Sequence, residues 1–349
     1  FGPFLQHARR RDLRKTVYKA YIQRCSGGEF DNRPLIDEIL SLRAEKAKLL
    51  GFATFAELSL SQKMAPSVDA AEGLLIELRE TCRAAGKTEL DELNAYAAAH
   101  GFDDPAGLKH WDAGFWSERL REEQYDIEQE ALRPFFPLPS VLAGLFELTE
   151  QMFGVTVRAA DGEQEVWNDD VRYFHVEDGG ELLATLYFDP YSRPADKRGG
   201  ALVNICATRS KLHATGGEAV RLPVTYMVCN QSPPDGDTPS LMTFGEVVTL
   251  FHEFGHALHN MLTEVDYAGA AGICNVEWDA VELPSQFMEN FCTHKPTLAK
   301  LAKHYQSGAT LDEAIMDRLI SARTFRAGSN FLRQICFGLT DLELHSRFD

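Results

Sequence analysis

Long apolar runs are missing from this 349-residue sequence, and no stretch approaches the roughly 20 residues that a membrane-spanning helix requires. No signal peptide opens the chain, and it contains neither internal repeats nor low-complexity segments. These absences exclude a membrane protein, a repeat array and a largely disordered chain. We expect a soluble protein with no membrane partner, long enough for about two domains.

Positive charge is scarce, because 35 Lys and Arg residues stand against 52 Asp and Glu residues and leave a formal net charge of −17. DNA, RNA and anionic membranes attract basic surfaces, so this charge argues against nucleic acid as a partner. A peptide with basic residues would suit the negative field. Many acidic proteins, however, use their charge only for solubility.

The cysteines show no pattern, since the seven are scattered, odd in number and never spaced as C-x-x-C. This excludes a secreted disulfide framework and is typical of reduced thiols in an intracellular compartment. The chain begins with Phe1 instead of Met and ends at Asp349 within a helical pattern. We therefore expect an internal fragment or a processed chain.

Three consecutive segments differ in their sequence pattern. Residues 1–153 predict helices joined by short loops. Within this segment, Ser67 to Gly86 predicts one helix, and Thr88-x-x-Asp91 resembles a capping box that predicts the start of another. Residues 154–242 predict a small sheet with loops, and residues 243–349 predict helices again. The fold class is therefore mainly α with a small β-sheet.

The sheet is predicted from short β-like runs separated by glycine and proline. The four predicted strands are residues 171–177, 182–188, 201–207 and 223–229. A turn at residues 189–194 is expected to end the second of them.

The strongest motif is the run His252-Glu253-Phe254-Gly255-His256 on a predicted helix. Two histidines one helical turn apart can hold one metal ion between them. Glu253 is rotated by about 100° from His252, so it can hold a water molecule without occupying the metal. Metal-assisted hydrolysis needs this arrangement, because the ion acidifies the water and the carboxylate accepts its proton. The competing interpretation is a buried helix whose histidines only form hydrogen bonds.

A third ligand has to come from elsewhere, because catalytic zinc has three protein ligands and one open position. Glu282 is the candidate, since Pro284 places it near the start of a second helix. Glu289 lies seven residues further on and hence on the same face, where it could orient a ligand histidine. A solvated helix face is the competing interpretation for Glu289.

Four further residues are weaker candidates for contacting substrate or supporting the site. His259 lies on the ligand-bearing face of its helix, although a polar surface histidine is the alternative. Gly199 and Gly200 precede a predicted strand and permit close approach of a peptide, or form a plain turn. Asp279 lies shortly before the third ligand.

The residues of this site also carry a family resemblance. Residues 251–259 and 278–292 (WDAVELPSQFMENFC) resemble the thimet-oligopeptidase family (M3) of zinc peptidases, in particular its oligopeptidase A and plant-type organellar branch. Further likeness lies in residues 187–200, 222–234 and 324–345. The pattern departs at Ala201, where similar sequences have Trp, and at Phe291, where they also have Trp.

This resemblance implies a fold and an activity. The expected fold is zincin-like of the gluzincin type, with two lobes enclosing a channel and the sheet beside the zinc. The expected protein is a zinc metalloendopeptidase that cleaves short unstructured peptides, with one Zn²⁺ per chain on His252, His256 and Glu282 and with Glu253 as the general base. We expect a monomer in the cytoplasm or in an organelle, either the mitochondrial matrix or the plastid stroma.

Two alternatives to this function have different sequence requirements. The family's chain continues past the position of Asp349 into a segment that contacts substrate, so a catalytically silent zinc- or peptide-binding fragment is one alternative. The intact Glu253 favours the enzyme, because a scaffold needs no general base. A gluzincin aminopeptidase would be expected to carry a motif such as G-x-M-E-N ahead of the helix, and this motif is missing.

Overall fold

The computed structural model describes residues 1–126, 129–197 and 200–347. The chain divides into two compact units, Phe1–Ile127 with Arg318–Asp349, and Glu128–Asp317. No helix in these described ranges is both long and apolar enough to cross a membrane. All seven cysteines lie in the described ranges as thiols, not as disulfides.

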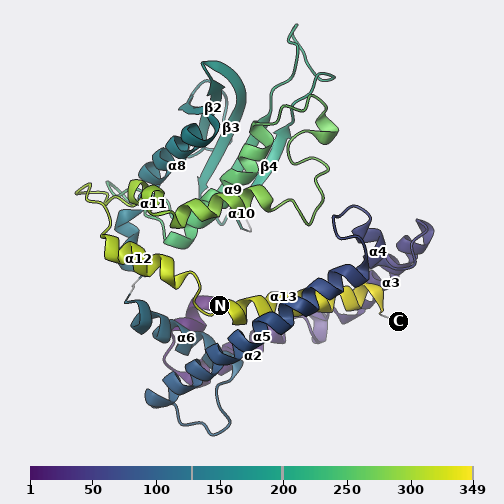
Figure 1. The fold of residues 1–349 in the computed structure, drawn as a ribbon, viewed down its shortest axis with the longest axis vertical. Helices are drawn as coiled ribbons and strands as arrows, with labels where there is room; N and C mark the ends of the chain where they lie inside the picture. The colour runs from purple at the N-terminus through teal and green to yellow at the C-terminus, as the bar shows by residue number, and fades with distance from the viewer. Residues whose placement is uncertain (127–128, 198–199, 348–349) are drawn as a thin grey trace. The chain divides into compact units, whose positions relative to one another are not determined.

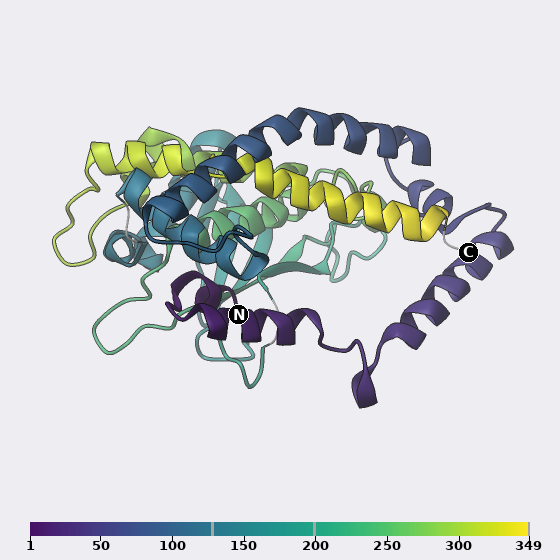
Figure 2. The same cartoon turned by 90° about the horizontal axis from the view of Figure 1, so that it is seen from below.

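The first unit is helical. Its helices are α1 (Gly2–His7), α2 (Arg11–Ile22), α3 (Arg33–Leu49), α4 (Phe55–Leu60), α5 (Val68–Ala99), α6 (His110–Tyr125) and α13 (Ala327–Ser346), with a 3-10 turn at Gly28–Phe30. Helix α12 (Glu313–Ala322) leads into this unit from the second one. Figures 1 and 2 show α5 and α13 running side by side, although they are far apart in the sequence.

The predicted helix start at Thr88 is wrong, because α5 is continuous from Val68 to Ala99. The Thr88 hydroxyl donates a hydrogen bond to the carbonyl of Ala84 inside the helix, at 3.1 Å. Gly86 stays helical because α13 packs closely on it: a Cβ atom there would lie 2.6 Å from Cδ1 of Leu332. Tertiary packing therefore overrides the local capping signal.

The second unit combines helices with one five-stranded sheet. Its helices are α7 (Gln129–Leu132), α8 (Leu138–Phe153), α9 (Phe244–Met261), α10 (Leu283–Glu289) and α11 (Lys295–Leu301), with 3-10 turns at Arg133–Phe135, Ala268–Ala270 and Asn290–Thr293. The strands are β1 (Thr156–Ala159), β2 (Arg172–Asp178), β3 (Glu181–Tyr191), β4 (Leu202–Ala207) and β5 (Val224–Gln231). The prediction of a mainly helical protein with a small sheet is confirmed.

The strand order is β1-β2-β3-β5-β4, with β3 parallel to β5 and the other pairs antiparallel. All four predicted strands form, with ends that differ by at most three residues. The predicted turn starts too early, because β3 continues past Asp189 to Tyr191. Pairing with β5 extends the strand: Tyr191 lies opposite Gln231, and the amide of Ser192 donates to the Gln231 carbonyl at 2.8 Å.

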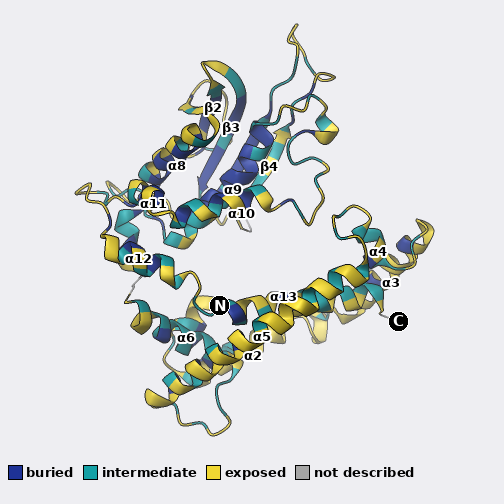
Figure 3. Cartoon of the chain, in the orientation of Figure 1, coloured by how far each residue is buried: buried dark blue, intermediate teal, exposed yellow. Residues whose placement is uncertain are grey.

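Helix α9 is the element that carries the metal motif, and its start is capped as the sequence predicts. The amide of Glu246 donates to the Thr243 hydroxyl at 3.1 Å, and the amide of Thr243 donates to the Glu246 carboxylate at 2.7 Å. The helix packs against β5, β4 and β3. Figure 3 shows most of α9 as buried, and its buried residues run from Val247 to Met261.

Removing this cap is expected to lower stability without touching the metal site. Thr243→Ala should reduce the free energy of unfolding by about 1 kcal/mol, the usual cost of losing an N-cap hydroxyl. Thr249→Ala is the matched control on the same helix, because its hydroxyl only donates back to the Gly245 carbonyl. Urea unfolding of both variants checks this, and equal midpoints would contradict it.

Candidate metal centre

Three potential ligand atoms converge at the junction of α9 and α10. Nε2 of His252 lies 3.2 Å from Oε2 of Glu282, and Nε2 of His256 lies 3.0 Å from the same oxygen. All three atoms lie within 4.8 Å of one another. Tetrahedral ligands about 2.0–2.1 Å from a zinc ion lie roughly 3.3 Å apart, so this spacing fits one such ion. Two imidazole nitrogens and one carboxylate oxygen are also a donor set that catalytic zinc uses.

The third ligand, the Glu282 carboxylate, is positioned by close contact between α9 and the start of α10. Gly255 faces that contact, because a Cβ atom there would lie 2.6 Å from the Pro284 carbonyl oxygen and 2.6 Å from Cα of Ser285. The Ser285 hydroxyl then donates to Oε2 of Glu282 at 2.8 Å. The absence of a side chain at Gly255 therefore lets Glu282 reach the two histidines.

The surroundings of the two histidines affect how each ring can bind a metal. Nδ1 of His252 lies 2.7 Å from Oε1 of Glu289, and because a carboxylate only accepts, Nδ1 carries the hydrogen. Nε2 of His252 is then left to face Glu282. Burial lowers the pKa of His256, which favours the neutral ring that binds metals. Burial acts to raise the pKa of Glu282, but the Ser285 hydrogen bond and both histidines outweigh it and the pKa is lowered.

Glu253 lies beside the three ligand atoms and does not join them. Its side chain is buried, with 7% of the residue exposed, and burial together with the charge of Glu282 raises its pKa. Burial and then the Glu253 charge raise the pKa of Cys229 on β5 to about 12. Glu253 directly follows His252 on α9, so its carboxylate can accept a proton from a water molecule held at the ligand cluster.

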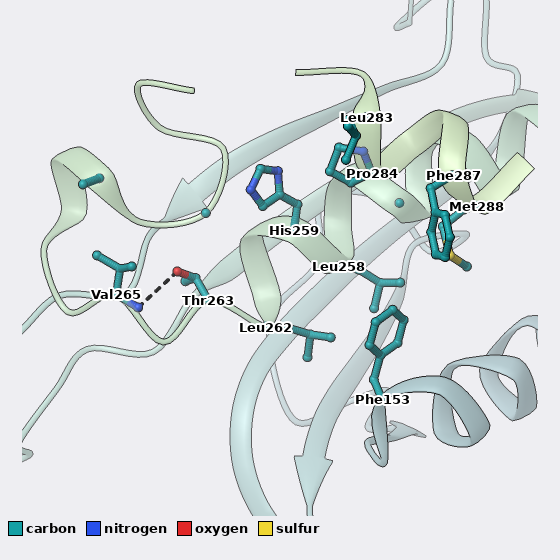
Figure 4. Close-up of a pocket in the computed structure, with 13 residues that line it drawn as sticks. Phe153, Leu258, His259, Leu262, Thr263, Val265, Leu283, Pro284, Phe287 and Met288 are labelled. Atoms are coloured by element: carbon teal, nitrogen blue, oxygen red, sulfur yellow. Dashed lines mark hydrogen bonds between the residues drawn. The ribbon is translucent and has the colours of Figure 1, made fainter. Parts of the chain in front are cut away.

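The remaining candidates have different surroundings. His259 lines a pocket of about 630 Å³ between α9 and α10, whose walls are mostly apolar side chains (Figure 4). Burial lowers the pKa of His259, and the ring lies outside the ligand cluster. Asp279 is exposed and also lies outside that cluster. Gly200 is exposed with open space around it, and Gly199 lies outside the described residues.

Sequence reasoning assigned no role to Gly255 or Ser285, although both position Glu282. Gly255 was visible only as a variable position inside the motif, and Ser285 as part of the segment that follows Glu282. Their roles depend on the contact between α9 and α10, which no local periodicity encodes.

Comparison with known sequences identifies the family to which the chain belongs. Residues 4–349 match the family described as Peptidase family M3. The chain belongs to this family. The resemblance seen in the motifs is thereby confirmed, and membership supports a peptidase.

Three relatives of this M3 chain illustrate the match. It is 54% identical over 347 residues to the organellar oligopeptidase A, chloroplastic/mitochondrial, of Arabidopsis thaliana, and covers 99% of its own length and 44% of the relative. It is also 54% identical over 347 residues to the probable cytosolic oligopeptidase A of the same plant, covering 99% and 49%. Identity to oligopeptidase A of Escherichia coli (strain K12) is 40% over 353 residues, covering 99% and 51%. The chain spans about half the length of these curated relatives.

The contact between His252 and Glu289 predicts a measurable effect on metal affinity. Glu289→Gln in this M3 chain should weaken zinc binding by about 10–100-fold, because the amide no longer orients the ring as a charged acceptor does. Exposed Glu277→Gln is the matched control and should leave the affinity unchanged. Competition with a chromogenic chelator measures both constants. Equal affinities in the two variants would show that Glu289 does not support the ligand.

Proposed function

We propose that this M3 chain carries the catalytic centre of a zinc-dependent metalloendopeptidase that hydrolyses short unstructured peptides. The observation that carries this proposal is the convergence of His252, His256 and Glu282 next to a buried carboxylate, Glu253. Membership of a peptidase family and the name oligopeptidase A of the relatives support the reaction and the peptide substrate.

Each residue has a defined part in the proposed reaction. When bound, zinc supplies Lewis-acid chemistry that acidifies a water molecule and polarises the peptide carbonyl. His252, His256 and Glu282 would hold the ion, and Glu289 orients the ring of His252. Glu253 accepts the proton of the attacking water and then delivers it to the leaving amine. Its raised pKa suits both steps, because the proton has to be taken and released near neutral pH.

The sheet offers a place for an extended peptide. Among the described residues, β4 has β5 as its only strand neighbour and forms one edge of the sheet. An extended peptide can add to such an edge through main-chain hydrogen bonds. Helix α9 packs on β5 and β4, so a peptide on this edge lies close to the ligand cluster. We therefore place the substrate backbone along β4.

Metal analysis tests the ligand assignment. His256→Ala and Glu282→Ala should each lose the single zinc that the unaltered protein retains, because two remaining protein ligands bind it weakly. His175→Ala, a histidine on β2, is the control and should keep its zinc. Stoichiometric zinc in both ligand variants on elemental analysis would show that the assignment is wrong.

The finer expectations from the sequence stay predictions. They are the zincin-like gluzincin fold with two lobes around a channel, the monomeric state, the location in the cytoplasm or an organelle, and the three-part division at residues 153 and 242. The alternative of a silent zinc-binding scaffold is not favoured, because Glu253 has no part in a scaffold.

A further inference from the structure

A buried carboxylate on β3 holds the segment that leads into the edge strand. Asp189 has 2% of its surface exposed and accepts two hydrogen bonds from the Arg193 guanidinium, at 2.8 and 2.6 Å. Lys197 donates a third at 3.0 Å, and the Trp167 indole donates a fourth at 3.1 Å. Four donors on one buried carboxylate form a strong, directional anchor.

Three of these four donors belong to two residues of the link between β3 and β4, Arg193 and Lys197. β3 ends at Tyr191 and β4 begins at Leu202, with β5 between these two strands in the sheet. The amide of Lys197 donates to the Arg193 carbonyl at 2.7 Å, so the link turns back toward β3 at this point. Its two cationic side chains therefore tie the link to the strand that it has just left.

The anchor lies level with the beginning of β4. In the sheet register, Asp189 of β3 lies opposite Val228 of β5, and Val228 lies opposite Leu202 of β4. Within the described part of the chain, β4 is paired on one side only. The register of a strand is set by its hydrophobic pattern and by the geometry of the turn that connects it.

The cluster is also close to the proposed catalytic centre. Burial and the charge of Glu253 raise the pKa of Cys229 on β5, while the charge of Lys197 acts to lower it. One thiol is thus within electrostatic reach of both Glu253 and Lys197. The sheet geometry agrees, because Asp189 lies opposite Val228, which precedes Cys229 on β5, and α9 packs against β5.

We infer that Asp189, acting through Arg193 and Lys197, is a positioning residue that fixes the edge strand β4 for binding of the peptide backbone. This inference rests on the proposed peptidase function and adds to it a determinant of substrate binding. The cluster touches none of the ligand atoms, so it acts on how the peptide binds and not on the chemical step. A looser β4 weakens substrate and transition state equally, which raises KM and leaves kcat unchanged.

The test uses Lys197, because removing Asp189 would leave two nearly buried cations without a counter-charge and could prevent folding. In the whole protein, Lys197→Gln should raise KM for a short quenched fluorescent peptide by roughly tenfold, the effect of losing one charge-assisted hydrogen bond. Zinc content and kcat should stay within about twofold of the unaltered protein. Lys197→Arg keeps the charge and the donor, so its KM for the peptide should stay close to that of the unaltered protein.

Hydrogen exchange gives a readout that does not depend on activity. Backbone amides of residues 202–207 should exchange faster in Lys197→Gln than in the unaltered protein or in Lys197→Arg. The matched control is Arg172→Gln on β2, which removes an exposed pair with Asp161 and should change neither exchange at β4 nor KM. Unchanged exchange, or an unchanged KM, in Lys197→Gln would overturn the inference. Failure of the proposed function is distinguishable, because the unaltered protein would then show no zinc-dependent turnover.

Discussion

Glu253→Gln in the whole protein is expected to lower kcat by about 10²–10⁴-fold, the usual contribution of a positioned general base. The amide has nearly the same shape as the carboxylate but cannot accept a proton at neutral pH. Zinc content should be unchanged, because Glu253 lies outside the group of His252, His256 and Glu282. Steady-state hydrolysis of a quenched fluorescent peptide, with zinc measured on the same samples, checks both statements.

Two comparisons make this result specific to the proton transfer. Exposed Glu264→Gln removes a carboxylate shortly after the end of α9 and should leave kcat unchanged. Glu253→Gln should also fold at least as well as the unaltered protein, because burial disfavours the charged form of Glu253 and a neutral amide avoids that cost. Near-normal turnover by Glu253→Gln with zinc bound would exclude Glu253 as the base.

Gly255→Ala is expected to damage both stability and metal binding, although the substitution adds a single methyl group. The new Cβ atom would meet the Pro284 carbonyl oxygen and Cα of Ser285, each at 2.6 Å, and both belong to the backbone of α10. Backbone atoms cannot move aside as a flexible side chain can, so α9 and α10 have to separate. Overpacking of this kind typically costs about 1–3 kcal/mol of stability.

The same separation of α9 and α10 would also weaken metal binding. Glu282 directly precedes α10, so moving α10 away from α9 carries its carboxylate away from His252 and His256. Zinc affinity should fall by at least about 10–100-fold, the effect of disturbing one supporting contact at a metal site. Unfolding in urea and titration against a chelator measure the two effects.

Gly245→Ala is the matched control, since it lies on the same helix with its nearest neighbour, the Thr243 hydroxyl, at 3.9 Å from the added atom. Alanine favours the helical backbone, so this variant should gain about 0.4–1 kcal/mol of stability and bind zinc normally. If Gly255→Ala behaved like Gly245→Ala, close contact between α9 and α10 would not be what positions Glu282.

The sequence alone determined the elements whose causes are local. The capping box at Thr243 and Glu246, the helical spacing of His252 and His256, and the position of Glu282 ahead of a helix that contains Pro284 all follow from neighbouring residues. Four strands were predictable for the same reason, because alternation and β-branched residues act over a few positions. The family membership was also readable in these segments.

Only the tertiary structure decided the features that join distant segments. Local patterns predicted a break near Gly86, but α13 packs on that glycine and α5 continues through it. The contact of Gly255 with Pro284 and the hydrogen bond from His252 to Glu289 each depend on how α10 packs against α9. The extension of β3 depends likewise on its pairing with β5. Such contacts are decided by packing between elements, because residues far apart in the chain leave no periodic trace in the sequence around either of them.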